Sequence, residues 1–259
     1  MKIVVLVKFV PEPSAAWTFA GDLTLDRGAV EGRLSELDEY AVEQAVRMVE
    51  AGADATITYL TVGPARAVDG LRKALAIGGD DAVHVLDDAM HGSCALSTSR
   101  VLAAALEKTG YDLVLTGMAS TDAEMSVMAS MLAERLGINQ ATFAGDLALE
   151  GDGVTIRREA ETESLTAHTA LPAVVSVTDQ TPEARYPAFK AIMGAKKKPL
   201  TTYSLADLGV DPALVGASAA SSRVLSVDKA PPRTAGEVLA DDGTGGERIA
   251  QFLGARGLL

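Results

Sequence analysis

The sequence predicts an α/β fold, in which helices cover both faces of a twisted sheet with a parallel core. Along about the first 140 residues, short continuous apolar runs alternate with stretches that have helical spacing. Continuous apolar runs are typical of strands buried on both faces, as in parallel sheets. Strands that alternate with helices indicate βαβ units, whose crossovers are almost always right-handed. Each expected element follows from its own local pattern.

The expected strands are short and apolar, and lie at residues 2–7, 55–62, 81–86 and 111–117. A helix is expected after each strand, at residues 35–52, 64–78, 95–110 and 122–137. Ser35 is expected to cap the first helix, and Pro64 suits the first turn of the second. The four consecutive units predict one parallel sheet.

Beyond residue 140 the pattern changes. Residues 143–161 indicate two strands around a Gly-Asp-Gly turn, and residues 163–179 indicate two more extended segments. These segments either extend the same sheet or form a small antiparallel layer on it. We therefore expect an α/β domain at residues 1–210 that includes this extension.

Residues 211–259 are expected to form an extended C-terminal arm. From about residue 213 to 244 the chain is rich in Ala, Ser, Gly, Pro and Asp, and only residues 222–228 resemble a strand. Such a composition cannot bury enough apolar surface to fold alone. A short amphipathic helix at residues 246–257 ends the chain. The arm is expected to pack on a partner subunit, with packing on its own domain as the alternative.

Composition excludes several classes of function. The net charge of −12 and the aromatic content of 4% argue against a nucleic-acid binder. Apolar runs are all shorter than the roughly 18 residues that a spanning helix needs, so no membrane insertion is expected. Cys94 is the single cysteine, which excludes an internal disulfide. We expect a cytoplasmic protein.

The candidate ligand site lies at the carboxyl ends of the parallel strands, near the switch in strand order. Gly63 follows one strand, and the loop from Gly117 to Met125 follows another, with Ser120, Thr121 and Asp122 at the next helix start. Free amides and the helix dipole at such positions favour a phosphate. The alternative is that these side chains only cap a helix. No Walker motif and no G-x-G-x-x-G follows any strand, so phosphoryl transfer and dinucleotide-dependent dehydrogenation are not indicated.

Residues for catalysis are equally absent. The histidines His84, His91 and His168 have no metal-ligand spacing with Cys94. His84 lies inside an expected strand, where a hydrogen-bonded structural role is predicted. We therefore expect a protein that binds a ligand without converting it, with no catalytic residues and no metal site.

Several stretches, in order, resemble one family: "VLVKFVPEP", "LDEYAVEQAV", "TVGPARAVDGLRKALAIGGDDAVHV", "DLVLTGMASTD", "LPAVVSVTDQTPEARYPAFKAIMGAKKKP" and "PPRTAGE". The chain is similar over essentially its whole length to the β subunit of electron transfer flavoproteins, above all to its actinobacterial members. The block from Leu171 to Pro199 is the most specific. The resemblance implies a Rossmann-like, adenine nucleotide α-hydrolase-like fold.

The resemblance also implies a non-catalytic electron carrier. Members of the family are αβ heterodimers in which FAD sits mainly in the α subunit and the β subunit holds an adenine nucleotide, usually AMP. They accept electrons from acyl-CoA and other flavin dehydrogenases and pass them to a membrane quinone oxidoreductase. Matched by position, the AMP pocket comprises Leu6, Ser35, Glu36, Leu37, Asp38, Val62, Gly63, Gly117, Met118, Ala119, Ser120, Thr121, Asp122, Ser126, Val127 and Met128.

The nucleotide loop departs from the family pattern. It has Ser126, Val127 and Met128 where the family has a polar segment, so fewer side-chain contacts to phosphate are expected. Some relatives hold a second FAD in place of AMP and bifurcate electrons, and that alternative stays open here.

The stretch "YPAFKAIMGAKKKPL" matches the family's recognition loop, at about residues 184–200. The resemblance implies that Phe189 inserts into a pocket of the dehydrogenase, and that Glu159 influences docking of the flavin domain. Ile192 and Met193 are expected to be core residues. The three lysines that follow, at 196–198, are expected to complement an acidic partner or local carboxylates.

A second class of function stays open beside the carrier. It is a stand-alone adenine-nucleotide-binding or ATP-hydrolysing protein on the same architecture, similar to universal stress proteins. That class needs a glycine-rich phosphate loop in the last strand–helix unit, and none follows "TGMAS". The long arm and the recognition-like block also have no role in it.

Overall fold

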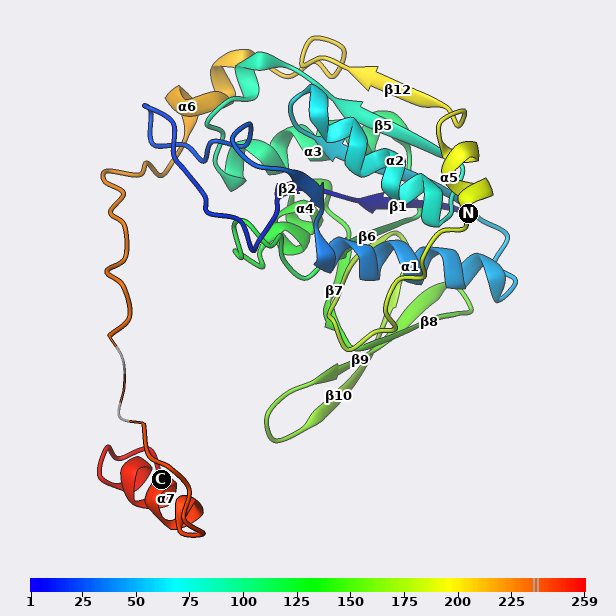
Figure 1. Ribbon diagram of the computed structural model, residues 1–259. Helices are drawn as coiled ribbons and strands as arrows, with labels where there is room; N and C mark the ends of the chain where they lie inside the picture. The colour runs from blue at the N-terminus through cyan, green and yellow to red at the C-terminus, as the bar shows by residue number, and fades with distance from the viewer. Residues whose placement is uncertain (235, 237) are drawn as a thin grey trace. The chain divides into compact units, whose positions relative to one another are not determined.

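The computed structural model describes residues 1–234, 236 and 238–259, and divides them into two units. The first unit is Met1–Leu225 and the second is Ser226–Leu259. The first unit holds all the strands and six of the α-helices described, which Figure 1 shows in colours from blue to orange.

The centre of the first unit is a seven-stranded parallel sheet with the order β12-β5-β4-β1-β6-β11-β7. Its strands are β1 (Lys2–Leu6), β4 (Thr56–Val62), β5 (Asp81–Val85), β6 (Leu113–Gly117), β7 (Asn139–Ala144), β11 (Ala173–Val177) and β12 (Leu200–Tyr203). The chain first builds outward from β1 to β4 and β5, and then crosses to β6 on the other side of β1. The switch in strand order therefore lies between β1 and β6.

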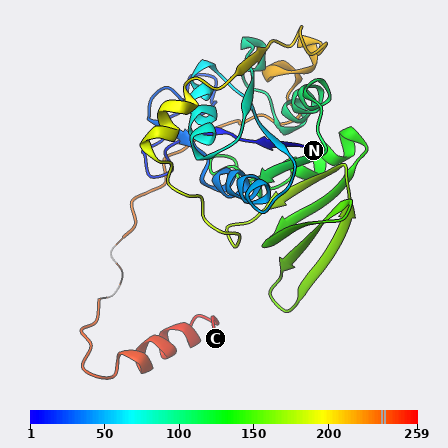
Figure 2. The ribbon, with the colours of Figure 1, turned by 90° about the vertical axis from the view of Figure 1, so that its right-hand side faces the viewer.

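Helices cover both faces of this sheet, as predicted, and Figure 2 shows them on either side. Along β1, Ile3 and Val5 contact the cluster formed with α1 (Glu36–Glu50) and α2 (Val68–Ile77). Val4 and Leu6 contact the cluster formed with α3 (Ala95–Thr109) and α4 (Met128–Leu136). The strand is apolar throughout because both of its faces are buried.

The later strands divide between two sheets. β8 (Asp146–Glu150), β9 (Gly153–Glu159) and β10 (Ser164–Ala170) form a three-stranded antiparallel sheet. Val154 and Ile156 of β9 are buried in the core cluster of the α1 face. The chain then returns to the main sheet as β11, so both alternatives foreseen for this region occur.

Two sequence-based predictions are wrong here, and one strand was not foreseen. The helix expected at 122–137 begins only at Met128, because Glu124 and Ser126 have left-handed backbone angles (φ 48° and 53°) that a helix cannot contain. β7 was not foreseen, since its sequence NQATFA lacks a continuous apolar run. Residues 222–228 form no strand.

Other local features connect the sheet to its surroundings. A two-stranded antiparallel pair, β2 (Phe9–Pro11) and β3 (Gly32–Leu34), was also not foreseen, and it brackets a loop over residues 12–31. The helix expected from Pro64 starts with a 3-10 turn, Ala65–Ala67. The other short helices are α5 (Phe189–Ala195), α6 (Gly216–Ala219) and the 3-10 turns Asp88–Met90 and Pro212–Leu214.

The described residues of the second unit include the helix α7 (Gly245–Gly254), close to the position expected for it. Ile249 and Phe252 on this helix are 62% and 47% exposed, and the chain's last two leucines are exposed as well. The unit begins at Ser226, somewhat later than the boundary expected from composition. That this arm packs on a partner subunit stays a prediction.

Candidate functional site

The candidate site lies where β4, β1 and β6 end side by side. Val62, Leu6 and Gly117 are the last residues of these three neighbouring strands, so their carboxyl ends share one edge of the sheet. The N-terminus of α1 reaches the same edge, because a Cβ added to Gly117 would lie 2.6 Å from the Leu37 carbonyl oxygen. The structure thus brings together four of the regions selected from the sequence.

Gly117 is required at this edge by close packing. Its hypothetical Cβ would also lie 2.8 Å from Asp38 Oδ1, a separation that real Cβ atoms do not show. Because the obstructing atoms include backbone, a larger residue would separate α1 from β6. The glycine therefore lets the first helix approach the loop that begins at residue 118.

Asp38 is buried beneath this loop. Its Oδ2 accepts a hydrogen bond from the backbone amide of Lys8 at 2.8 Å. Burial raises the pKa of Asp38 to about 7, and backbone hydrogen bonds from Lys8 and Gly117 act in the opposite direction. A carboxyl group in this place carries only part of its negative charge near neutral pH.

Asp122 lies in the loop after β6 and forms ion pairs with two cationic side chains. Lys8 Nζ is 2.8 Å from Asp122 Oδ1, and Arg27 Nη2 is 2.5 Å from Asp122 Oδ2. Lys8 Nζ also donates to Ser120 Oγ at 3.2 Å. Burial alone would raise the pKa of Asp122, but the charges and hydrogen bonds of Lys8 and Arg27 outweigh it and lower the pKa to about 2. The cluster has two positive groups for one fully charged carboxylate.

Ser35 is the N-cap residue of α1, as expected, and its carbonyl accepts hydrogen bonds from the amides of Asp38 and Glu39 at 3.0 and 3.2 Å. Its side chain makes no capping hydrogen bond and instead accepts a long one, 3.4 Å, from the backbone amide of Thr121. The expected N-cap position of Ser35 is therefore confirmed, although its side chain is buried and contacts the neighbouring loop instead of the helix. Ser120, Thr121 and Asp122 do not cap α4, since that helix begins after Val127. The Thr121 hydroxyl is buried without a hydrogen-bond partner.

Gly63 is placed as expected but its amide is not free. Its N–H donates to the Val85 carbonyl at 3.1 Å, and its own carbonyl lies 2.9 Å from His84 Nε2. Gly63 itself thus offers no free amide, and the structural, hydrogen-bonded role expected for His84 is confirmed. Glu36, also selected from the sequence, is exposed and pairs with Arg33 at 2.8 Å.

An adenine nucleotide suits several of these features. The loop from Met118 to Val127 contains non-glycine residues in the left-handed region, and turns of this kind can form anion-binding concavities of backbone N–H groups. Lys8 and Arg27 add positive charge, and the Thr121 hydroxyl has a free hydrogen bond to offer. The two cavities described for this chain lie elsewhere, over α2 and beside β2 and β3. The residues present therefore fit a phosphate at the loop.

The segment expected to contact a dehydrogenase is exposed. Phe189, the first residue of α5, is 79% exposed and Tyr186 is 97% exposed. Ile192 and Met193 are 41% and 47% exposed, so the expectation that they are core residues is wrong. In α5 it is Ala195 that is buried, because this short helix contacts α2 by its C-terminal end.

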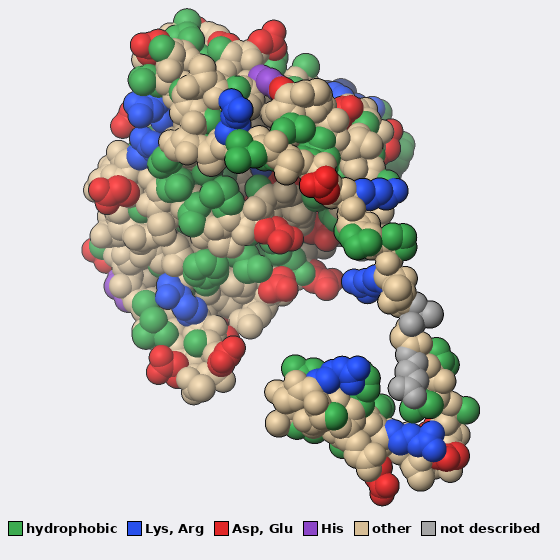
Figure 3. Space-filling view, turned by 90° about the vertical axis from the view of Figure 1, so that its left-hand side faces the viewer, with side chains coloured by type: hydrophobic (Ala, Val, Ile, Leu, Met, Phe, Trp, Pro, Cys, Tyr) green, Lys and Arg blue, Asp and Glu red, His purple; other side chains and the backbone are tan. Residues whose placement is uncertain are grey.

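The remaining selected positions lie apart from this edge. Glu159, at the end of β9, is held by Arg157 at 2.7 Å and by the Ser164 hydroxyl. Of the three lysines after α5, Lys198 donates to the Leu75 carbonyl at 2.8 Å instead of pairing with a carboxylate. Charged side chains of both signs are scattered over the face in Figure 3 and form no broad basic area on it.

Sequence reasoning missed Lys8, Arg27 and Arg185. Lys8 could have been found, since a lysine directly after a buried strand lies at the carboxyl edge of the sheet. Arg27 and Arg185 are in irregular segments and contact residues 95 and 142 positions away, so no local pattern marks them.

Comparisons with known proteins decide the family. The model of the electron transfer flavoprotein domain matches residues 22–208. The chain belongs to the electron transfer flavoprotein family. It is 43% identical to the electron transfer flavoprotein subunit beta of Mycobacterium leprae, and 42% to that of Mycobacterium tuberculosis, each over 99% of both chains. It is 31% identical to the one from Megasphaera elsdenii, over 92% of this chain and 91% of that protein.

Family membership confirms the resemblance inferred from the sequence. The relatives are named as subunits of an electron carrier, so this chain is an electron carrier subunit and not an enzyme. Among the described residues, no helix is long and apolar enough to cross a membrane. Those residues also contain no group of three or more His, Cys, Asp or Glu side chains placed to hold a metal ion.

Proposed function

We propose that this chain is the β subunit of a heterodimeric electron transfer flavoprotein, in which it binds a structural AMP and recognises flavin dehydrogenases. The α subunit of the heterodimer would hold most of the FAD. The heterodimer would carry electrons from acyl-CoA-type dehydrogenases to a membrane quinone oxidoreductase. Similarity to named β subunits over 99% of the chain is the observation that carries this proposal.

The geometry supports the nucleotide part of the proposal. The loop from Met118 to Val127 stands at the switch between β1 and β6, where open α/β sheets bind their ligands. Lys8 and Arg27 supply positive charge beside it. Backbone amides of the loop would hold the phosphate, and the adenine would lie against the strand ends near Leu6 and Val62.

Exposure supports the recognition part. Phe189 is a large apolar residue with 79% of its surface exposed, on a helix whose other end is fixed to the domain. An aromatic side chain that becomes desolvated on binding is a typical hot spot of a protein interface. A single anchor of this kind would leave the flavin domain free to sample orientations for electron transfer.

Paired purification tests the assignment. The chain is expressed alone and with its α partner, the visible spectrum is recorded, and the nucleotides released by acid are identified. One FAD and one AMP per heterodimer are expected. Two FAD and no AMP per heterodimer would contradict the AMP assignment and would indicate an electron-bifurcating flavoprotein instead. A colourless chain that ignores the α subunit and hydrolyses ATP would overturn the proposal in favour of a stand-alone nucleotide-binding protein.

Phe189→Ala tests recognition separately. We expect KM for the heterodimer in dehydrogenase-dependent reduction to rise about tenfold or more, since hot-spot residues dominate binding energy. Flavin and AMP content should not change. Leu165→Ala, at a half-exposed leucine on β10, is the matched control and should leave KM unchanged. A wild-type KM for Phe189→Ala would show that Phe189 does not contribute to docking.

A further inference from the structure

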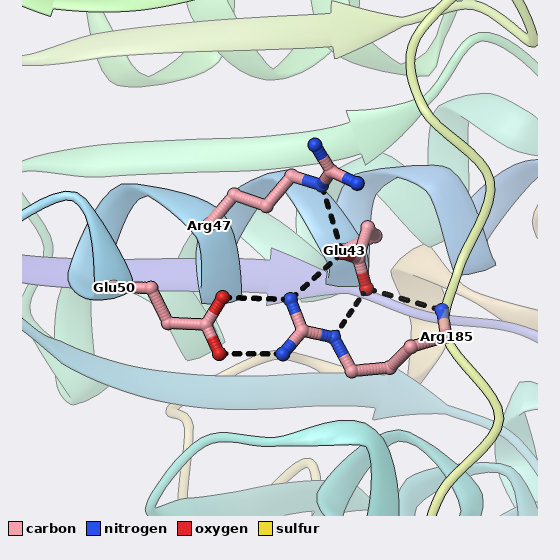
Figure 4. A network of polar contacts seen from close by, with 4 residues as sticks. All are labelled: Glu43, Arg47, Glu50 and Arg185. Atoms are coloured by element: carbon pink, nitrogen blue, oxygen red, sulfur yellow. Dashed lines mark hydrogen bonds and ion pairs between the residues drawn. The ribbon is translucent and has the colours of Figure 1, made fainter.

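Arg185 connects the segment between β11 and α5 to helix α1, as Figure 4 shows. Its Nε and Nη2 donate to the two oxygens of Glu43 at 3.0 and 2.8 Å. Its Nη1 and Nη2 donate to the two oxygens of Glu50 at 2.5 and 2.8 Å. The backbone amide of Arg185 also donates to Glu43 Oε2 at 3.2 Å. Both the side chain and the main chain are therefore fixed at this residue.

Glu43 makes this contact more than a surface ion pair. Its side chain is only 1% exposed, although it is charged and lies on the middle of a helix. Arg47 donates to the same carboxylate at 2.8 Å, so two arginines and two glutamates balance their charges. A buried carboxylate that loses its partner keeps the cost of desolvation without the compensating attraction. Release of the segment would leave Glu43 with Arg47 as its remaining partner, so the contact with Arg185 favours the attached segment.

The far end of the same segment is fixed on α2. Arg72 Nη1 donates to the carbonyl oxygens of Ala195 and Lys198 at 2.7 and 2.8 Å. Lys198 Nζ returns a hydrogen bond to the Leu75 carbonyl at 2.8 Å. Residues 185 and 195–198 are therefore two attachment points, each held by an arginine.

Between these attachment points the chain presents its apolar side chains outward. Tyr186 and Phe189 are 97% and 79% exposed, and Tyr186 directly follows Arg185. A mobile segment would have to be ordered on binding, at a cost in conformational entropy that subtracts from affinity. A segment whose ends are already fixed avoids most of that cost.

We propose that Arg185 is a positioning residue for partner docking: by joining Glu43 and Glu50 on α1, it holds residues 186–192 in the conformation that presents Phe189. This inference rests on the proposed function, because it assigns a supporting residue to the same docking surface. It adds that affinity for the dehydrogenase depends on a contact that the dehydrogenase itself does not touch. The rate of electron transfer within the bound complex should not depend on it.

Two measurements on the heterodimer test the proposal. Hydrogen–deuterium exchange of peptides covering residues 184–195 reports the order of the segment without any dehydrogenase. Steady-state reduction by an acyl-CoA dehydrogenase gives KM and kcat. The variants are Arg185→Ala, Arg185→Lys, Glu50→Gln and Phe189→Ala, and each is first checked for unchanged flavin content and circular dichroism.

For Arg185→Ala we expect exchange in this segment to accelerate about tenfold and KM to rise about fivefold, with kcat within about twofold of the wild type. Arg185→Lys, which keeps the charge but loses the paired geometry, should be intermediate. Glu50→Gln should be intermediate as well, and it carries the test if Arg185→Ala does not fold. Phe189→Ala should raise KM without changing exchange.

Three outcomes would overturn the proposal. Unchanged exchange in Arg185→Ala would show that the contact does not order the segment. Faster exchange with a wild-type KM, while Phe189→Ala raises KM, would show that order is irrelevant to docking. A wild-type KM in both Arg185→Ala and Phe189→Ala would instead show that this segment does not bind the dehydrogenase. That result would also contradict the recognition part of the proposed function.

Discussion

Lys8 Nζ and Asp122 Oδ1 lie 2.8 Å apart, although 114 positions separate the two residues in the chain. The ion pair joins the segment after β1 to the loop after β6, across the switch in strand order. The Asp122 side chain is completely buried, whereas those of Lys8 and Arg27 keep over a third of their surface exposed. The carboxylate therefore organises the loop, and the cations remain accessible to an anion.

Replacement of Asp122 by Asn should destabilise the fold at neutral pH. The pKa of Asp122 is lowered in the folded state to about 2, so its contribution is fully present above the unfolded value of 3.8 and is lost as pH falls through about 2. The difference in pKa corresponds to about 2 kcal/mol of unfolding free energy. Urea denaturation at pH 7 should show this loss, and the difference in unfolding free energy between Asp122→Asn and the wild type should become smaller below about pH 4. Asp179→Asn, at an exposed loop position, serves as the control and should unfold like the wild type.

Asp38 should give the opposite dependence on pH. Burial raises its pKa from 3.8 to about 7 in the folded state, so its contribution is fully present below pH 3.8 and is lost as pH rises through about 7. Relative to Asp38→Asn, the wild type should lose on the order of 4 kcal/mol of stability between pH 4 and pH 8. Denaturation curves of both proteins over this range measure it. A constant difference between them would mean that Asp38 titrates normally.

Gly117→Ala should disturb the nucleotide site through the backbone. The new methyl group would meet the Leu37 carbonyl and Asp38, so α1 or the loop must move. We expect a loss of about 1–3 kcal/mol of unfolding free energy, as for other overpacked sites, together with a lower AMP content per heterodimer. Gly194→Ala is the matched control, since a Cβ at Gly194 meets no atom within 4 Å. Full AMP content in Gly117→Ala would show that the nucleotide does not bind at this edge of the sheet.

Deletion of residues 226–259 should separate folding from assembly. The first unit contains both core clusters, so the shortened chain should melt within a few degrees of the full chain when each is measured alone. The shortened chain lacks the exposed apolar residues of α7, such as Ile249, so we expect it to bind the α subunit more weakly. Size-exclusion chromatography after co-expression is expected to show a reduced yield of heterodimer. Full assembly without these residues would contradict a partner-binding arm.

The parallel sheet could be predicted from the sequence because its strands are buried on both faces. A run such as Ile3 to Leu6 has to be apolar throughout, and such runs are visible in a single sequence. The family was equally visible, in stretches that follow one another along the whole chain. β7 was not predictable because it is a partly exposed edge strand without a continuous apolar run. The late start of α4 was not predictable because the backbone angles at Glu124 and Ser126 override local preference.

In the candidate site, too, some residues could be predicted from the sequence and others could not. Gly63 and Gly117 were found because they lie where expected strands end, and the ends of parallel strands meet at one edge, whereas Leu6 and Val62 came from the resemblance to the family. The pairing of Asp122 with Lys8 and Arg27 was not found, and neither was that of Arg185 with Glu43. The sequence by itself determined the family, the α/β architecture and the edge of the sheet that holds the candidate site. Only the tertiary structure decided which charges meet there, because such pairs form between segments that folding brings together and leave no periodic pattern in the chain.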